Sequence, residues 1–368
     1  MPRSPVYLDH AATTPVDPRV LEGMLPHFSQ THGDPSSVHT FGPQAEAAVE
    51  SARADVATIL GCSPSELVFT ACGSVSDNLA LRGAAFAERQ LQRHFGFQPD
   101  WLPVDPYGRI SPDDLREKLS RSTAVVSIVY ANNKIGTANP IAALAAECRA
   151  IGVPFHTDAL QAASQLPVDV GTLGVDLLAL GARKFYGPKG VGALNVKDGL
   201  ALLPWLTGGS QEHGLRAGTH NVPLIVDLAE AFQLTSRERD QRNAPMAALR
   251  DRIIRSVLAH VPDSHPTGHP TECLPNHASF VFRGVVGNRC WPRSISKVPP
   301  ARQGPPASPA LPNPRRSGWR SGCRLRWRWA RCASPSGRTP APKTLTASST
   351  CCLRSSRESV ERHPLRHE

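Results

Sequence analysis

The chain has 368 residues, 40% of them hydrophobic, which is enough for one large domain and a smaller one. It has no run of about 18 apolar residues and no apolar signal core after Met1, which excludes a membrane helix and favours the cytoplasm. Residues 289–368 hold 17 basic and 3 acidic residues, whereas residues 1–288 are mildly acidic, so the net charge of +10 does not indicate nucleic-acid binding by the whole chain.

Apolar strands alternate with helical patterns along residues 1–288. The pattern predicts helices over 41–61, 75–88, from 111 onward, 140–152 and 224–237. It predicts strands over 66–70, 124–129, 153–157, 175–180 and 191–196. Such an alternation is typical of an α/β fold, with a mostly parallel sheet that is covered by helices on both faces.

Polar residues follow several of these strands, at the edge where ligands bind in parallel sheets. They are Ser74, Asn133, Asp158 and Lys184. Each one also has a simpler explanation when taken alone: an ordinary helix cap, a turn residue, a helix N-cap and a solvated loop lysine. Their joint position at one sheet edge favours a binding site.

Several motifs together resemble one known family. The motifs lie at 7–15 (YLDHAATTP), 33–37, 68–70, 76–78, 132–136, 156–161, 184–190 and 216–219. In this order, over about residues 5–287, they resemble the cysteine desulfurases of the class V aminotransferase group. The resemblance implies the fold of pyridoxal-phosphate (PLP)-dependent transferases of fold type I, with an incomplete second α/β domain.

The resemblance also implies roles for individual residues. Lys184 would hold PLP covalently and later move the α-proton of the substrate. Asp158 would pair with the ring nitrogen, while the other contacts to the ring and the phosphate would come from Gly73, Ser74, Asn133, Gln161 and Arg183. Thr219 would reach the phosphate of a neighbouring subunit, which implies a homodimer. No metal site is expected, because the nine cysteines show no C-x-x-C pair.

The family reaction removes sulfur from L-cysteine. It leaves L-alanine and a persulfide on a cysteine of the enzyme, and the sulfur passes to an acceptor or scaffold protein for iron–sulfur clusters or thio-cofactors. Two alternatives stay open. The chain is a selenocysteine lyase or another class V enzyme, or it is an inactive truncated product or a binding protein with a basic tail.

The sequence departs from the family at four places. Gly181 and Arg183 replace a serine and a histidine before the lysine, and Asp34 replaces an asparagine near the substrate. The stretch 90–97 is too short for the family strand, and His94 does not match the histidine that stacks on the ring. The persulfide cysteine and the substrate arginine have no match after residue 288. Cys72, near the expected phosphate site, is interpreted as a packed residue.

These departures give a division into three parts. Residues 13–222 form the predicted large domain, and residues 1–12 with 223–288 form a partial small domain. Residues 289–368 hold 12 of the 35 prolines and four of the six tryptophans. Their composition suggests a frameshift near Gly287, and the alternative is a disordered basic tail that binds nucleic acid or an anionic membrane.

Overall fold

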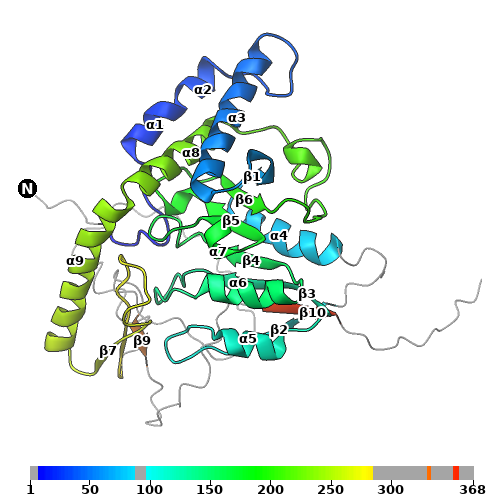
Figure 1. Ribbon diagram of the computed structural model, residues 1–368. Coiled ribbons are helices and arrows are strands. Elements are labelled where there is room, and N and C mark those ends of the chain that lie inside the picture. The colour runs from blue at the N-terminus through cyan, green and yellow to red at the C-terminus, as the bar shows by residue number, and fades with distance from the viewer. Residues whose placement is uncertain (1–6, 88–96, 285–329, 333–350, 356–368) are drawn as a thin grey trace, which may run out of the picture.

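The computed structural model describes residues 7–87, 97–284, 330–332 and 351–355 of the chain. Seven strands form the main sheet, in the order β1–β6–β5–β4–β3–β10–β2 (Figure 1). Only β6 and β10 run against the others, so the predicted mostly parallel sheet is confirmed. The strands are β1 (Leu67–Thr70), β2 (Phe97–Asp100), β3 (Thr123–Val129), β4 (Phe155–Asp158), β5 (Leu177–Gly181), β6 (Gly192–Val196) and β10 (Cys351–Ser355).

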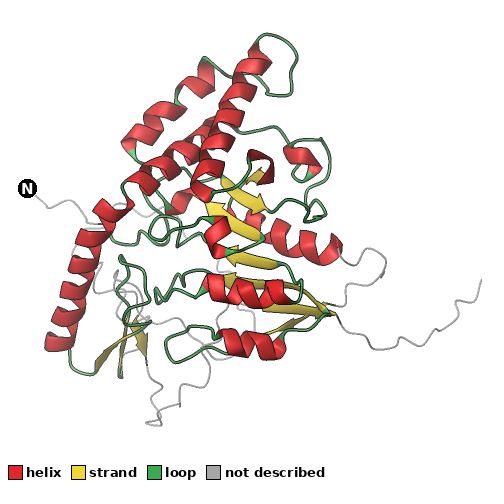
Figure 2. Cartoon of the chain, viewed as in Figure 1, coloured by secondary structure: helices red, strands yellow, loops and turns green. Residues whose placement is uncertain are grey.

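Helices cover both faces of this sheet (Figure 2). Helix α4 (Gly73–Ala87) packs on the sheet face to which the Leu177 side chain belongs. The Leu178 side chain lies on the opposite face, which packs against α3 (Phe41–Leu60), α6 (Ile141–Ala150) and α8 (Val222–Arg237). Neighbouring residues of β5 therefore enter two separate apolar cores, because side chains alternate along a strand.

Residues that the sequence indicates as helix ends and caps have these roles in the structure. Gly61 ends α3 in the left-handed conformation with φ 67°, which glycine adopts without a steric penalty. The Ser111 side chain accepts a hydrogen bond from the N–H of Asp113 (3.2 Å) and so caps α5 (Pro112–Lys118). Three shorter helices complete this part, namely α1 (Pro18–Met24), α2 (Pro26–Ser29) and α7 (Val170–Leu173).

A second, three-stranded sheet lies beside helix α9 (Arg239–His260). Its strands are β7 (Ser264–Pro266), β8 (Phe280–Phe282) and β9 (Ala330–Cys332). Three buried residues of β8 and its approach, Ala278, Phe280 and Phe282, pack against the apolar side of α9. Within the described residues, no helix is both long enough and apolar enough to cross a membrane.

Two short segments of the basic tail form strands. Strand β9 pairs with β8, and β10 lies between β3 and β2, antiparallel to both. The stretch 90–97 is too short for the family strand, and β10 stands between β3 and β2 in the sheet. Residues 88–96, which include His94, lie outside the described residues.

Asp227 of α8 is a buried acid in an otherwise apolar helix face. The residue is 0% exposed, and neither carboxylate oxygen has a hydrogen-bond partner. Burial, with a smaller contribution from the charge of Glu230, raises the pKa of Asp227 from 3.8 to about 7. The carboxyl group therefore ionises at a lower pH in the unfolded chain than in the folded one, and it destabilises the fold increasingly between about pH 4 and about pH 7.

We expect Asp227→Ala to raise the free energy of unfolding at about pH 8 by about 2 kcal/mol. It should also remove most of the decline in stability with rising pH. Urea unfolding at several pH values measures both effects. Asp240→Ala is the matched control, because it removes an acid whose side chain is 97% exposed. An Asp227 variant that behaves like this control would contradict the assignment of a buried, unpaired acid.

Candidate active site

Three predicted site residues donate hydrogen bonds to the same short stretch of backbone. The Lys184 ammonium group donates to the carbonyl oxygens of Ala11 (2.5 Å) and Ala12 (3.1 Å). The Gln161 side chain also donates to Ala11 (3.0 Å), and the Arg183 guanidinium donates to Ala12 (2.5 Å). Lysine, arginine and glutamine donors therefore converge on one place, although they come from two different segments.

The N-terminal segment is held there by Thr14. Its N–H donates to the carbonyl oxygen of Arg183 (2.9 Å), and its hydroxyl accepts from the N–H of Tyr186 (2.8 Å). Lys184 itself ends a short 3-10 turn (Ala182–Lys184) that follows β5. The lysine thus lies at the carboxyl end of a central strand, where the sequence predicted it.

Asp158 ends the neighbouring strand β4, and its carboxylate accepts a hydrogen bond from the N–H of Leu160 (2.9 Å). Burial and the negative charge of Asp77 raise the pKa of Asp158, while positive charges on His156 and Lys184 lower it. Asp158 and Lys184 therefore lie at the carboxyl ends of the paired strands β4 and β5. The structure brings together the two groups on which the sequence interpretation depended most.

The first turn of α4 begins at the same edge of the sheet. A Cβ atom added to Gly73 would lie 2.2 Å from a methyl group of Leu160, so the start of the helix packs directly on the turn after Asp158. A Cβ atom added to Gly181 would lie 3.4 Å from the backbone nitrogen of Gly73. The N–H groups of this helix start, with the exposed Ser74, point to an anion site beside the lysine turn.

Two predicted site residues lie apart from this group of contacts. Asn133 is exposed in a turn that is closed by the side chain of Asn132, which accepts from the N–H of Lys134 (2.8 Å). Thr219 is exposed on the loop before α8. Within the described residues, neither side chain makes a hydrogen bond. Asp34, which stands where the family has an asparagine, is also exposed. Its carboxylate accepts a hydrogen bond from the N–H of Ser36 (2.9 Å).

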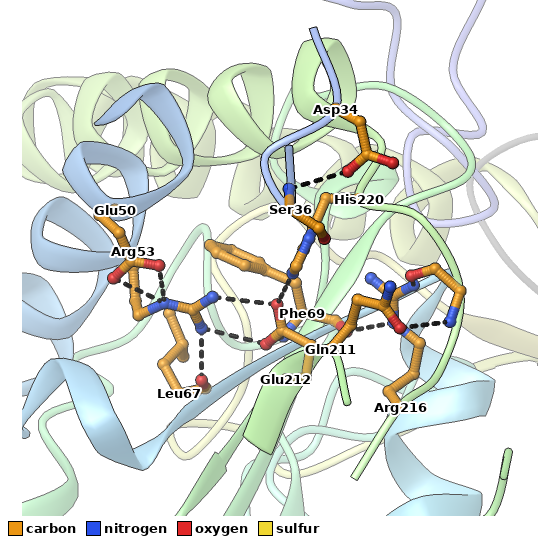
Figure 3. A network of polar contacts seen from close by, with 11 residues as sticks. Asp34, Ser36, Glu50, Arg53, Leu67, Phe69, Gln211, Glu212, Arg216 and His220 are labelled. Atoms are coloured by element: carbon orange, nitrogen blue, oxygen red, sulfur yellow. Dashed lines mark hydrogen bonds and ion pairs between the residues drawn. The ribbon is translucent and has the colours of Figure 1, made fainter. Parts of the chain in front are cut away.

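A buried ion pair fixes the loop that carries Thr219 (Figure 3). Glu212 receives two hydrogen bonds from Arg53, of 2.9 and 3.0 Å, and one from the N–H of Phe69 (2.7 Å). His220 lies 2.6 Å from the same carboxylate. Burial opposes the charge, but the bonds from His220 and Arg53 outweigh it and lower the pKa of Glu212 to about 2.

The same loop has one further bond to strand β1 and one bond within itself. The Arg216 side chain donates to the carbonyl oxygen of Phe69 (3.0 Å), and the Gln211 side chain accepts from the N–H of Gly218 (3.1 Å). Glu212 has a positive φ of 51°, a conformation that non-glycine residues seldom adopt and that the surrounding bonds must hold. Sequence reasoning did not find the Arg53–Glu212 pair, because nothing in the spacing relates two positions so far apart.

A groove of about 530 Å³ lies beside the lysine turn, between the N-terminal segment and α9. Ala11, whose carbonyl oxygen bonds to Lys184, and Tyr186 line the groove, and so do apolar residues of α9 such as Leu249 and Ile253. Small molecules bind in concave, mostly apolar sites of this kind. The groove therefore gives a candidate space for a substrate next to Lys184.

The described residues fit a PLP molecule. The cofactor requires a lysine amine, an acid for its ring nitrogen and backbone N–H groups for its phosphate. Lys184, Asp158 and the start of α4 meet at one sheet edge, and the donors that converge on Ala11 and Ala12 add polar groups around it. The hydroxyl that the family serine would supply is missing at Gly181.

Comparisons with known proteins show the family to which the chain belongs. The family model described as Aminotransferase class-V matches residues 6–90 and 84–290. A cysteine desulfurase IscS of Methanosarcina thermophila is 40% identical, over 77% of this chain and 74% of its own length. A cysteine desulfurase IscS of Dictyoglomus turgidum is also 40% identical, over 77% of each chain.

Solved structures give the same result. A NifS-like protein has a TM-score of 0.74 and 33% identity, over 78% of this chain and 85% of its own. A structure described as SspA in complex with cysteine has a TM-score of 0.68 and 32% identity, over 79% and 86% of the two chains. Both the sequence and the fold therefore place this chain in the class V aminotransferase family of PLP-dependent enzymes, among the cysteine desulfurases.

Proposed function

We propose that this chain binds PLP at Lys184 and removes sulfur from L-cysteine. The observation that supports this most strongly is the meeting of Lys184, Asp158 and the α4 start at one sheet edge. Among the reactions of the family, the relatives named cysteine desulfurase favour the removal of sulfur from cysteine. Bound PLP would supply an electron-accepting ring that stabilises negative charge on the substrate carbon.

The residues of the chain would bind the cofactor and move the protons. Asp158 would hold a proton on the ring nitrogen, and the N–H groups at Gly73 and Ser74 would bind the phosphate. Gln161 and Arg183 would exchange their present bonds to Ala11 and Ala12 for bonds to the cofactor. Asn133 would contact the ring. The amine of Lys184 would take the proton from the α-carbon of cysteine and return a proton as alanine forms.

Of the four cysteines whose side chains the structure describes, Cys62, Cys148 and Cys273 are unsuited to the sulfur step, and Cys72 is interpreted as a packed residue. Burial raises the pKa of Cys62 to about 11 and also raises that of Cys273, which disfavours the reactive thiolate at both. Cys148 is buried in the core. We therefore propose that the sulfur passes to a thiol supplied from outside, and that turnover is slow without one.

The wider context is proposed from the family. The chain would act in the cytoplasm as a homodimer, with Thr219 at the phosphate of the neighbouring subunit, and would deliver sulfur to an acceptor or scaffold protein for iron–sulfur clusters. Residues 13–222 would form the PLP-binding domain. Residues 1–12 and 223–288 would form a partial second domain, and residues 289–368 a basic tail.

The test is product formation by the full chain after incubation with PLP, L-cysteine and a thiol reductant. We expect L-alanine and sulfide in equal amounts, because each cleaved carbon–sulfur bond yields one of each. Omitting the thiol should lower the rate several-fold, and L-selenocysteine in a parallel reaction shows which substrate is preferred. If no alanine appears above a reaction without protein, although PLP binds, the desulfurase proposal is wrong.

A further inference from the structure

Three polar side chains form a row beside strand β4, which also carries Asp158. They are Ser127, His156 and Asp77. Ser127 and His156 are register partners on β3 and β4, and the Ser127 hydroxyl lies 2.9 Å from Nδ1 of His156. On its other side, Nε2 of His156 lies 3.5 Å from the Asp77 carboxylate on α4. His156 is only 1% exposed, so the polar groups around it are supplied by the protein.

Two atoms in this row of side chains have no hydrogen-bond partner, and they face each other. They are Nε2 of His156 and the facing oxygen of Asp77, which are both buried. In the positively charged imidazole both ring nitrogens carry a proton, so Nδ1 donates to the Ser127 hydroxyl and the Nε2 proton lies on the side of Asp77. The arrangement is thus suited to place a positive charge on His156 next to the negative charge of Asp77.

This pair lies on the same side of the sheet as Asp158. His156 and Asp158 are two residues apart on β4, so their side chains leave the strand on one face, the face that α4 covers. The charged and titratable groups acting on Asp158 are Asp77, His156 and Lys184. Asp77 disfavours a second negative charge at Asp158, and a positive charge on His156 offsets this effect.

We propose that His156 and Asp77 are positioning residues that keep the Asp158 carboxylate ionised for the ring nitrogen of PLP. Their roles deepen the proposed function and rest on it. Without the imidazole charge, the negative charge of Asp77 at Asp158 is no longer offset, and a neighbouring negative charge makes a carboxyl group retain its proton to higher pH. A protonated Asp158 cannot pair with a positively charged ring nitrogen, so PLP binding weakens.

The test measures the dissociation constant of PLP for the cofactor-free full chain between about pH 5 and about pH 9. The midpoint is the pH at which the affinity is half of its maximum. We expect His156→Gln to move the midpoint upward by about one unit, with about tenfold weaker binding near the wild-type midpoint and nearly unchanged binding at high pH. Glutamine retains hydrogen-bonding capacity toward Ser127 and Asp77 but cannot carry the charge.

Two further variants separate a charge effect from structural damage. Asp77→Asn should move the midpoint downward, because it removes the neighbouring negative charge. The double variant of His156→Gln and Asp77→Asn should return close to the wild-type midpoint. His265→Gln, which removes an exposed histidine on β7, is the matched control and should leave the midpoint unchanged.

The outcomes distinguish this inference from the proposed function. If the wild-type chain does not bind PLP, the proposed function itself fails. If PLP binds but His156→Gln lowers its affinity by the same factor at every pH, His156 has only a structural role and the inference is wrong. The inference is also overturned if the double variant is weaker than both single variants, since a charge balance predicts recovery.

Discussion

Replacing Glu212 by alanine is expected to lower the free energy of unfolding by about 3–5 kcal/mol. The substitution removes the buried charged partner of the Arg53 guanidinium, whose side chain is only 6% exposed, and leaves only the exposed Glu50 as its counter-charge. It also removes the acceptor for the N–H of Phe69 in β1. A buried charge that has lost its partner keeps its full desolvation cost, which explains the size of the effect. Urea unfolding of the full chain measures it.

Glu50 provides a control within the same network. It also bonds to Arg53 (3.0 Å), but its side chain is 56% exposed, so Glu50→Ala should cost no more than about 1 kcal/mol. Combining Glu212→Leu with Arg53→Met removes both charges and should recover much of the loss. Equal losses from Glu212→Ala and Glu50→Ala would show that burial of the pair does not determine its contribution.

Replacing Lys184 by alanine is expected to abolish the visible absorbance band that forms when PLP is added. The covalent attachment requires the amine, and no other described lysine lies at this sheet edge next to Asp158. The same variant should give no alanine from L-cysteine, because it also lacks the group proposed to move the α-proton. Absorbance titration and product analysis measure the two losses.

Lys189 is the matched control for this variant. It belongs to the same loop, five residues on, but it is exposed. Lys189→Ala should therefore keep both the band and the activity. A Lys184→Ala protein that still develops the wild-type band would place the attachment at another residue.

The sequence predicted the sheet well where local patterns and the fold agree. The apolar run 124–129 became β3, and the 175–180 segment became most of β5 with Lys184 after it. Glycines at helix ends and the Ser111 cap gave correct boundaries, because their effects depend on a few adjacent residues. The sequence also placed Asp158 and Lys184 at one edge, since strand ends in a parallel sheet meet there.

Other features depend on contacts between distant segments and were not predictable. The Arg53–Glu212 pair joins α3 to a loop more than a hundred residues later, and the carbonyl groups of Ala11 and Ala12 reach the lysine only through the folded N-terminal segment. The position of β10 between β3 and β2 was also missed, because the composition of residues 289–368 shows no strand period. The roles given to the site residues stay predictions, and Asn133 and Thr219 also lie apart from the contacts around Lys184.

The central claim is that Lys184 is the residue that bonds to PLP. The most direct measurement is to incubate the full chain with PLP, reduce the product with borohydride, digest it and locate the modified lysine by mass spectrometry. We predict one modified peptide, containing Lys184, in stoichiometric yield. Modification spread over exposed lysines such as Lys189 and Lys197, with Lys184 unmodified, would contradict the claim.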